Sequence, residues 1–288
     1  MSGMALLPSL CDCFVEASSG TRAPNGNFVK EFTSGKKERF FQRLWEMLLA
    51  RHLDAQGHRL NSPALGPDFR FVHGDRVVWV EAISPEPRGL PADWMELPAP
   101  NTVRVGRVPH DEIALRWTAA FKEKWDKLSD YRRKQIVAEG DAYVIAIHGG
   151  QLGALPLDHG ISRYPLALET VFPIGPLAIP VDRETGKIGK SVTSERFSIQ
   201  NANGSPVPTT PFVNTNYAGV SAVLAYSGDR SSNSSLPAYV VHNPSLASLC
   251  PSVFSDVMPK SGMPSRSGQQ AWKWTFGSAR RHWSHKVV

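Results

Sequence analysis

The chain has 288 residues, 41% hydrophobic and 20% charged, a balance ordinary for a globular protein of one large domain or two small ones. Its formal net charge of +6 favours an anionic partner such as nucleic acid. Three cysteines without a CxxC pair argue against a disulfide scaffold and against a zinc site built from cysteines.

The N-terminal sequence MSGMALLPSLCDCFVEA indicates neither secretion nor a membrane anchor. It lacks a basic leader and is interrupted by Asp12 and Glu16. No apolar run approaches the roughly 20 residues that cross a bilayer. We therefore expect a soluble, cytoplasmic protein with no membrane partner, and we expect residues 1–36 to be poorly structured.

The first predicted element is an amphipathic helix over residues 38–53, which ends near Gly57. Its apolar residues recur at helical spacing on one face: Phe40, Phe41, Leu44, Trp45, Leu48 and Leu49. Residues 66–85 follow as a pair of strands. The segment 84–100, SPEPRGLPADWMELPAP, is too rich in proline for a regular element.

A second helix is predicted over residues 111–133, where Trp117, Phe121, Trp125 and Leu128 share one face. The apolar run 141–150 that follows is typical of a buried strand. Further strands are predicted over 166–174, 177–182, 220–226 and 238–243. The segment 183–216 is rich in Gly, Ser, Asn, Thr and Pro, so loops and one hairpin are expected there.

The order helix, strand, strand, helix, strand through residue 150 predicts an α/β (α+β) fold with a mixed central sheet flanked by helices. The later strands are expected to extend this sheet. We therefore predict one domain over residues 37–255 and a basic, aromatic tail over 256–288.

The stretch GPDFRFVHGDRVVWVEAISP, residues 66–85, carries two acids in otherwise apolar surroundings, Asp68 and Glu81. Gly74-Asp75 suits a two-residue type II′ hairpin loop. Such a loop pairs residues whose numbers sum to 149, so that Asp68 lies opposite Glu81. Directly opposed residues share a face, with Cβ atoms about 4.5–5.5 Å apart.

Two carboxylates this close repel each other unless a proton or a cation lies between them. Oxygen ligands without nitrogen or sulfur partners favour Mg²⁺ or Mn²⁺ over zinc. The alternative is that Asp68 starts a turn and Glu81 faces water. A register shift of one residue would place the two acids on opposite faces of the hairpin.

The arrangement of Pro67-Asp68, a strand, a turn and a second strand ending in Glu81 resembles the restriction-endonuclease-like PD-(D/E)XK nuclease superfamily. The resemblance covers residues 38–150 and includes the helix before the hairpin and the helix and strand after it. It implies an αβββαβ core with extra C-terminal strands. It also implies Mg²⁺ or Mn²⁺ bound by Asp68 and Glu81, and metal-dependent hydrolysis of phosphodiesters in DNA.

The sequence departs from the family motif at Ile83, where the family has a lysine. Some family members supply the lysine from the following helix, and there Lys124 lies closest to the apolar face. Lys124 is therefore expected to replace the missing lysine. The alternative is that Lys124 extends from the edge of the apolar face into solvent. An ammonium within about 4–6 Å of either carboxylate would favour catalysis.

The family also places an acid on the first helix near the metal. Glu38 flanks the apolar face on an ideal wheel, whereas Glu46 lies between Trp45 and Met47 in a strongly apolar segment. We take Glu46 as the candidate, with a solvated acid on the helix surface as the alternative for either residue.

Basic residues support a nucleic-acid partner. Residues 104–134 hold nine Lys or Arg against five acids, and no acid follows Asp256. In the tail, Trp272, Trp274 and Trp283 alternate with basic residues, as phosphate contacts and base stacking require. The alternative is a solubilising tail. The sequence leaves the oligomeric state open, a homodimer included.

Two rival functions remain. Because Ile83 replaces the family lysine, the chain could be an inactive nucleic-acid-binding or structural protein on the same fold. The segment VIAIHGGQLG, residues 144–153, is similar to the oxyanion-hole loop of esterases, but the chain lacks a G-x-S-x-G nucleophile motif. A serine within hydrogen-bond reach of His148 would favour the esterase.

Overall fold

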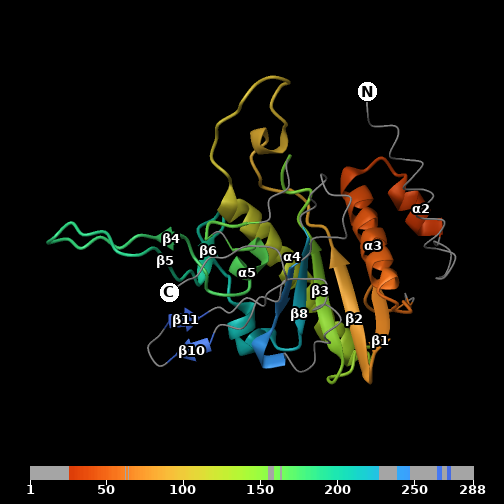
Figure 1. Ribbon diagram of the computed structural model, residues 1–288. Helices are drawn as coiled ribbons and strands as arrows, with labels where there is room; N and C mark the ends of the chain where they lie inside the picture. Colours follow the sequence, from red (N-terminus) through yellow and green to blue (C-terminus); the bar gives the residue numbers. More distant parts are fainter. Residues whose placement is uncertain are drawn as a thin grey trace.

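The structure is a computed structural model that describes residues 26–61, 63, 65–154, 159–162, 164–226 and 239–246, and the backbone of 265–267 and 271–273. A five-stranded sheet with the order β1-β2-β3-β8-β9 forms its centre (Figure 1). The strands are β1 Phe69–His73, β2 Arg76–Ile83, β3 Ala142–His148, β8 Ala222–Tyr226 and β9 Tyr239–His242. The main helices are α3 Lys37–Ala55 and α4 His110–Arg133. The predicted α/β fold with a mixed sheet is confirmed.

The central strands β2, β3 and β8 run parallel, whereas β1 and β9 pair antiparallel at the two edges. All seven residues of β3 are buried, as expected for a parallel strand covered on both faces. The predicted strands 141–150, 220–226 and 238–243 are therefore confirmed, and the last two extend the sheet as expected.

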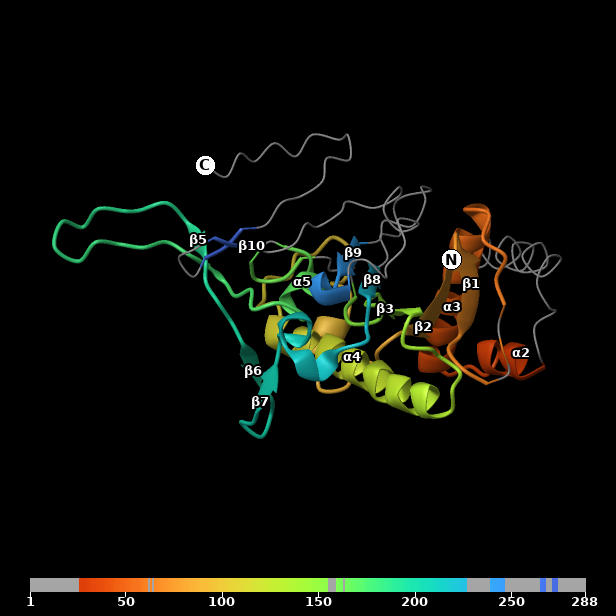
Figure 2. The same cartoon turned by 90° about the horizontal axis from the view of Figure 1, so that it is seen from below.

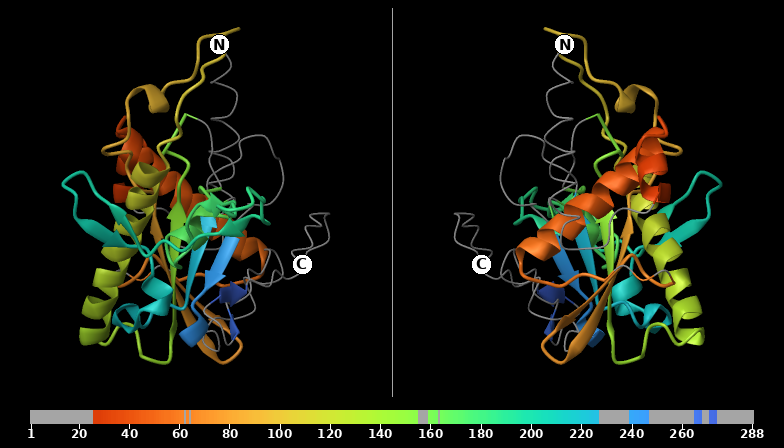
Figure 3. Two further views of the ribbon diagram at one scale, coloured as in Figure 1. Left: turned by 90° about the vertical axis from the view of Figure 1, so that its left-hand side faces the viewer. Right: turned by 90° about the vertical axis from the view of Figure 1, so that its right-hand side faces the viewer.

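The two main helices cover opposite faces of the sheet (Figures 1 and 3). Alternate residues of β2 divide between two separate cores because side chains on a strand alternate in direction. Val78 and Val80 pack in the core that contains Trp45 of α3. Trp79 and Ile83 pack in the core that contains Trp117 and Phe121 of α4. Any side chain of β2 at an odd position therefore points toward α4.

The predicted αβββαβ core differs in one respect, since among the described residues between α3 and α4 there are two strands, β1 and β2, and not three. On the outer edge of β1, a single bridge joins Asn61 to Arg70 through two backbone hydrogen bonds of 2.8 and 2.7 Å. Gly66 and Pro67 separate this bridge from β1 in sequence. Proline cannot donate to a β-ladder, so the paired strand begins only after it.

Part of the N-terminal segment predicted to be poorly structured is ordered, since Gly26–Phe32 form helix α2. Its contacts with α3 explain the difference. The rings of Phe32 and Phe40 lie 4.9 Å apart, and Glu31 forms an ion pair with Arg43 at 2.5 Å. Residues 1–25 lie outside the described residues.

One predicted strand is wrong, and another forms only in part. Residues 166–174 contain the short helix α5, Leu166–Glu169, followed by a turn. Its residues are buried, and a short buried apolar run does not distinguish a strand from a helix. Within 177–182 only Leu177–Ala178 form a strand, β4, because prolines at 176 and 180 interrupt the ladder.

Strand β4 pairs with β5, Val192–Thr193, at the base of a long hairpin that projects from the sheet (Figures 1 and 2). We call residues 175–194 the arm. Its exposed apolar residues are Leu177, Ile179, Val181, Ile188 and Val192. The predicted turn in TGKIGK lies at the arm's tip, where the amide of Asp182 donates to Lys187 O at 2.9 Å.

The remaining elements are short. Strands β6 Ser198–Gln200 and β7 Pro206–Pro208 form the hairpin that was expected within 183–216. The proline-rich loop contains only one 3₁₀ turn, Asp93–Met95, and rises beyond the end of β2 in Figure 1. Other 3₁₀ turns are Pro211–Val213, Thr215–Tyr217 and Pro244–Leu246.

In the predicted tail 256–288, the structure describes only the backbone of β10 Ser265–Ser267 and β11 Ala271–Lys273, which pair antiparallel. The remaining tail residues lie outside the described residues, and so do the contacts of its tryptophans. Within the part of the chain that the structure describes, no helix has the length and apolar character required to span a membrane.

Candidate active site

The β1–β2 hairpin has the predicted turn and register. His73 pairs with Arg76 and Phe69 with Val80, so paired residue numbers sum to 149. Gly74 has φ of 61°, and Asp75 is not among the residues with positive φ. This combination is that of a type II′ turn, in which glycine at the first loop position adopts the left-handed conformation without steric cost.

Continuing this register by one residue places Asp68 opposite Glu81, on the face of the sheet that α4 covers. The next ladder position would belong to Pro67, which has no N–H. At this position a side chain replaces the backbone as the acceptor. The amide of Ala82 donates a hydrogen bond to Oδ2 of Asp68 at 2.7 Å. Asp68 therefore closes the end of the hairpin as well as facing Glu81.

Glu81 is buried, and α4 supplies three donors to its carboxylate. Nζ of Lys124 lies 2.9 Å from Oε1 of Glu81, and Nζ of Lys127 lies 3.1 Å from the same oxygen. The phenol of Tyr131 donates to Oε2 at 3.4 Å. The Lys124–Glu81 contact is well within the 4–6 Å that the sequence-based criterion required. Lys127 and Tyr131 were not predicted.

The Asp68 carboxyl has a pKa raised to about 7, first by burial and then by the neighbouring charges of Glu81 and Glu46. The ammonium of Lys124 and the amide of Ala82 lower this pKa but do not compensate. Near neutral pH, Asp68 is thus divided between its protonated and ionised forms. The pair of acids is short of positive charge even with Lys124 beside it.

Lys124 has the opposite shift. Burial alone would lower its pKa, but the charges of Glu81 and Asp68 outweigh burial and hold the pKa above its usual value. The ammonium is therefore fully protonated at neutral pH. The phenol of Tyr143 on β3 donates to the backbone oxygen of Lys124 at 2.9 Å, which holds this turn of α4 against the sheet.

Glu46 is buried as expected, whereas Glu38 is exposed. Glu46 lies on α3, so it approaches from the opposite face of the sheet and does not contact Asp68 or Glu81 among the described contacts. It pairs instead with Arg43, and its Oε1 accepts from Nε2 of Gln42 at 2.9 Å. Gln42 also donates to the backbone oxygen of Ala82 at 3.2 Å, which connects Glu46 to the end of β2.

Ile83, at the position of the family lysine, is 8% exposed and packs in the core beneath α4. A lysine there would compete for the space that apolar side chains fill. The ammonium group comes instead from Lys124 of α4, which contacts the carboxylate of Glu81 from the helix side of the sheet.

The oxygen-only donor set fits a hard divalent cation. Asp68 and Glu81 are two carboxylates, and among the described residues no hydrogen-bond donor contacts Oδ1 of Asp68. No group of three or more His, Cys, Asp or Glu suitable for a metal occurs within the described ranges. Mg²⁺ is often held by only one or two carboxylates, with water and phosphate oxygens completing its shell.

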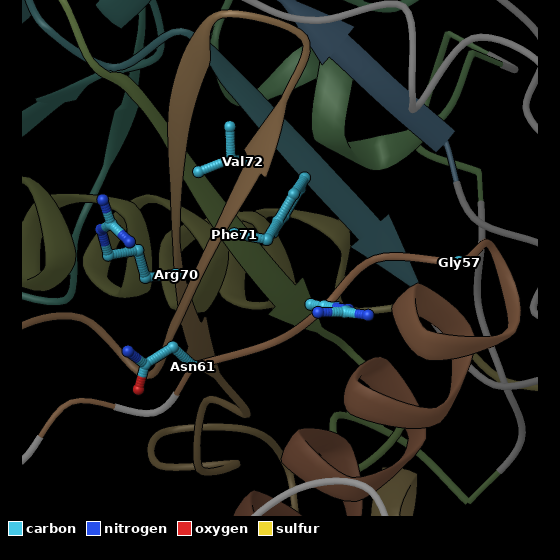
Figure 4. A pocket seen from close by; sticks show the side chains of 6 residues that line it. Gly57, Asn61, Arg70, Phe71 and Val72 are labelled. Carbon is cyan, nitrogen blue, oxygen red and sulfur yellow. The ribbon is translucent and has the colours of Figure 1, made fainter.

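An open hollow of about 410 Å³ lies at the outer edge of β1, beside the bridge to Asn61 (Figure 4). Its lining includes Arg59 and Arg70. Arg70 follows Asp68 by two residues on the same strand face, and its guanidinium lies 5.6 Å from the centre of the Trp79 ring. Positive charge is therefore available within one strand repeat of the carboxylates.

A serine does lie near His148, as an esterase would require, since Oγ of Ser84 is 3.3 Å from Nδ1 of His148. Both residues are buried, and the imidazole stacks against Trp45 and Tyr226. Burial lowers the pKa of His148 to about 4, and no acid of the described chain raises it. Because a triad needs an orienting acid and an accessible serine, this cluster lacks two parts of an esterase site.

Comparison with known proteins gives no relative for this arrangement: no family model, no curated protein and no solved structure matches the chain.

Proposed function

We propose that the protein is a metal-dependent phosphodiesterase that acts on DNA in the cytoplasm, with Asp68, Glu81 and Lys124 at its active site. The observation that carries this proposal is the 2.9 Å contact between Lys124 Nζ and Glu81 Oε1. It places an ammonium beside two opposed carboxylates on a strand hairpin. This combination of charges is the one that the resemblance to PD-(D/E)XK nucleases implies.

Asp68 and Glu81 would hold Mg²⁺ or Mn²⁺. Such an ion supplies polarisation of the phosphodiester and acidification of water. The residues of the chain then have distinct tasks. Asp68 must be ionised to bind the cation. Lys124 stays protonated because its pKa is raised, so it acts as a hydrogen-bond donor and a fixed positive charge and not as a base.

Phosphate contacts of the DNA backbone would come from basic residues around the site. Arg70 and Arg59 line the hollow beside the hairpin, and Lys127 lies at the mouth of the carboxylate cluster. Several separate basic residues around the site suit a polymeric substrate better than a small phosphoester.

The test is cleavage of single- and double-stranded DNA with Mg²⁺ or Mn²⁺ by the full chain and by Asp68→Asn, Glu81→Gln and Lys124→Met. Each variant is expected to lower kcat at least 100-fold, as removal of a single transition-state donor does elsewhere. Asp126→Asn, an exposed change on α4, is the matched control and should cleave normally. Equal cleavage by all variants would point to a contaminating nuclease and reject the assignment.

A second candidate, a nucleic-acid-binding protein without catalysis, is favoured by one observation. Glu81 already has two ammonium partners and a phenol, which can neutralise it without a metal. In this case the wild-type protein would bind DNA, cleave none of it, and show no change in melting temperature with divalent cations.

A further inference from the structure

The carboxylate of Glu81 is contacted by two lysines of the same helix, and the two differ in what they can do. Lys124, Lys127 and Tyr131 are spaced three and four residues apart, so they lie along one face of α4 above Glu81. Both ammonium groups reach the same oxygen, Oε1. A single carboxylate oxygen needs only one of them as its counter-charge.

Exposure separates the two lysines. The side chain of Lys124 is 7% exposed, and that of Lys127 is 43% exposed. A buried ammonium that leaves its carboxylate has no water to solvate it, so Lys124 is fixed in place. The ammonium of Lys127 is in contact with solvent, so water can hydrate it once it leaves, while Glu81, only 3% exposed, keeps Lys124 as its counter-charge. Lys127 can therefore exchange Glu81 for another anion.

Charge balance indicates which anion. Asp68 and Glu81 together carry two negative charges when ionised, and Lys124 and Lys127 carry two positive charges. A divalent cation on the two carboxylates leaves a surplus of two positive charges. A phosphodiester at the mouth of the site would reduce that surplus, and Lys127 is the lysine that reaches both Glu81 and solvent.

We propose that Lys127 is the residue that binds the substrate phosphate, leaving Glu81 when the divalent cation binds and donating to a non-bridging oxygen of the DNA backbone. The inference rests on the proposed function, whose site it extends. It assigns separate tasks to the two lysines: Lys124 remains on Glu81, and Lys127 changes partner. A Lys127 that only neutralises Glu81 would contribute no more to DNA affinity in the presence of the cation than any other exposed lysine.

Lys122 provides a matched control on the same helix. It is exposed and pairs with Asp126 at 2.7 Å, one helical turn away and apart from Glu81. Removing its charge changes the net charge of the protein by the same amount as removing that of Lys127. A general loss of attraction to DNA therefore affects both variants equally, whereas a specific phosphate contact affects only one.

The experiment measures the affinity of the full chain for a fluorescein-labelled DNA duplex, with Ca²⁺ in place of Mg²⁺ and in parallel with EDTA. Wild type, Lys127→Met, Lys127→Arg and Lys122→Met are compared between about 50 and 200 mM KCl. In Ca²⁺, Lys127→Met should raise Kd about tenfold and reduce the salt slope by about 1. Lys127→Arg should restore most of the affinity, and in EDTA Lys127→Met should bind no more weakly than Lys122→Met.

Cleavage kinetics in Mg²⁺ complete the test, with KM expected to rise for Lys127→Met and kcat to fall less than KM rises. If Lys127→Met cleaves and binds like Lys122→Met, the inference is overturned while the proposed function stands. If no variant cleaves but binding still depends on Lys127 in Ca²⁺, the phosphate contact stands and catalysis is rejected. A wild-type chain that binds no DNA would reject both.

Discussion

The ammonium of Lys124 lies 2.9 Å from Oε1 of Glu81 although the two residues are 43 positions apart in the sequence. Neither side chain has more than a few per cent of its surface exposed. The contact joins a strand of the hairpin to the helix that crosses over it. It therefore belongs at once to the packing of the fold and to the proposed site.

Removing the charge of Lys124 is expected to destabilise the protein strongly. Lys124→Met leaves the buried Glu81 with only the half-exposed Lys127 as its charged partner, and loss of one partner of a buried pair costs about 3–5 kcal/mol. In the double variant Glu81→Gln with Lys124→Met, the free energy of unfolding should fall by less than the sum of the two single effects. Urea denaturation measures each value.

The control for that experiment is Lys122→Met, which removes an exposed ion pair and should change the free energy of unfolding by less than about 0.5 kcal/mol. If Lys124→Met were as mild as this control, the buried ion pair would not be a structural requirement.

Asp68→Asn is expected to stabilise the metal-free protein at alkaline pH. The pKa of Asp68 is about 7 in the folded protein and 3.8 in the reference state, so folding favours the protonated form. The resulting stability is fully present below about pH 4 and is lost as the pH rises through 7. Asparagine keeps an oxygen for the Ala82 amide and carries no charge.

Melting temperatures of both proteins from pH 5 to pH 8.5 check this sign. The melting temperature of Asp68→Asn should exceed that of wild type by a margin that grows with pH. In a domain of this size, each kcal/mol of added stability raises the melting temperature by roughly 2–4 °C. A constant difference across the pH range would show that the Asp68 carboxyl titrates normally.

Divalent cations should stabilise the wild-type protein more at pH 8 than at pH 6. Binding requires ionised Asp68, so a proton is released at the lower pH and affinity falls. At a Mg²⁺ or Mn²⁺ concentration of about 100 times Kd, binding adds about 2.7 kcal/mol to the free energy of unfolding. Titration calorimetry in two buffers of different ionisation enthalpy measures the protons released.

The same titration with Asp68→Asn and with Glu81→Gln supplies the comparison. Each variant lacks one of the two carboxylates, and neither should gain stability from the cation. A gain equal to that of wild type would place the cation elsewhere on the protein.

The arm is expected to be dispensable for folding. Its residues between Leu177 and Val192 are exposed, and its base is closed by backbone hydrogen bonds between Gly175 and Ser194 and between Ser194 and Pro176. Replacing residues 177–192 by a short glycine linker preserves that base. The melting temperature should stay close to that of wild type.

Ile199→Ala is a suitable comparison, because Ile199 follows the arm but is buried in the core. This truncation should lower the free energy of unfolding by about 2–5 kcal/mol. An arm deletion that is as damaging as this core change would show that the exposed hairpin contributes to the folded state.

The sequence was sufficient for the parts of the site that depend on local geometry. Gly74-Asp75 set the turn, and the turn set the register that opposes Asp68 and Glu81. Helical periodicity then identified Lys124 as the lysine nearest the apolar face of α4. Each of these inferences uses a repeat of two or about 3.6 residues, which sequence spacing records directly.

Lys127 was missed because a helical wheel records the direction of Cβ and not the reach of the side chain. On the wheel it lies further from the centre of the apolar face than Lys124 does, yet its four-carbon stem carries the ammonium back to Glu81. The strand predicted over 166–174 failed for another reason. Its apolar residues are buried as expected, but burial alone does not select strand over helix.

Helix α4 is the crossover that connects β2 to β3, so the site is complete only when this crossover packs on the sheet. The β1–β2 hairpin is held by contacts between residues close in sequence, which cost less chain entropy to close than the contacts with α4 do. Until α4 docks, Glu81 is a carboxylate in an apolar strand facing a second acid, without an ammonium to offset either one. The step that buries the apolar face of α4 is therefore also the step that neutralises Glu81, so a chain that reaches the packed state already carries the assembled cluster of charges.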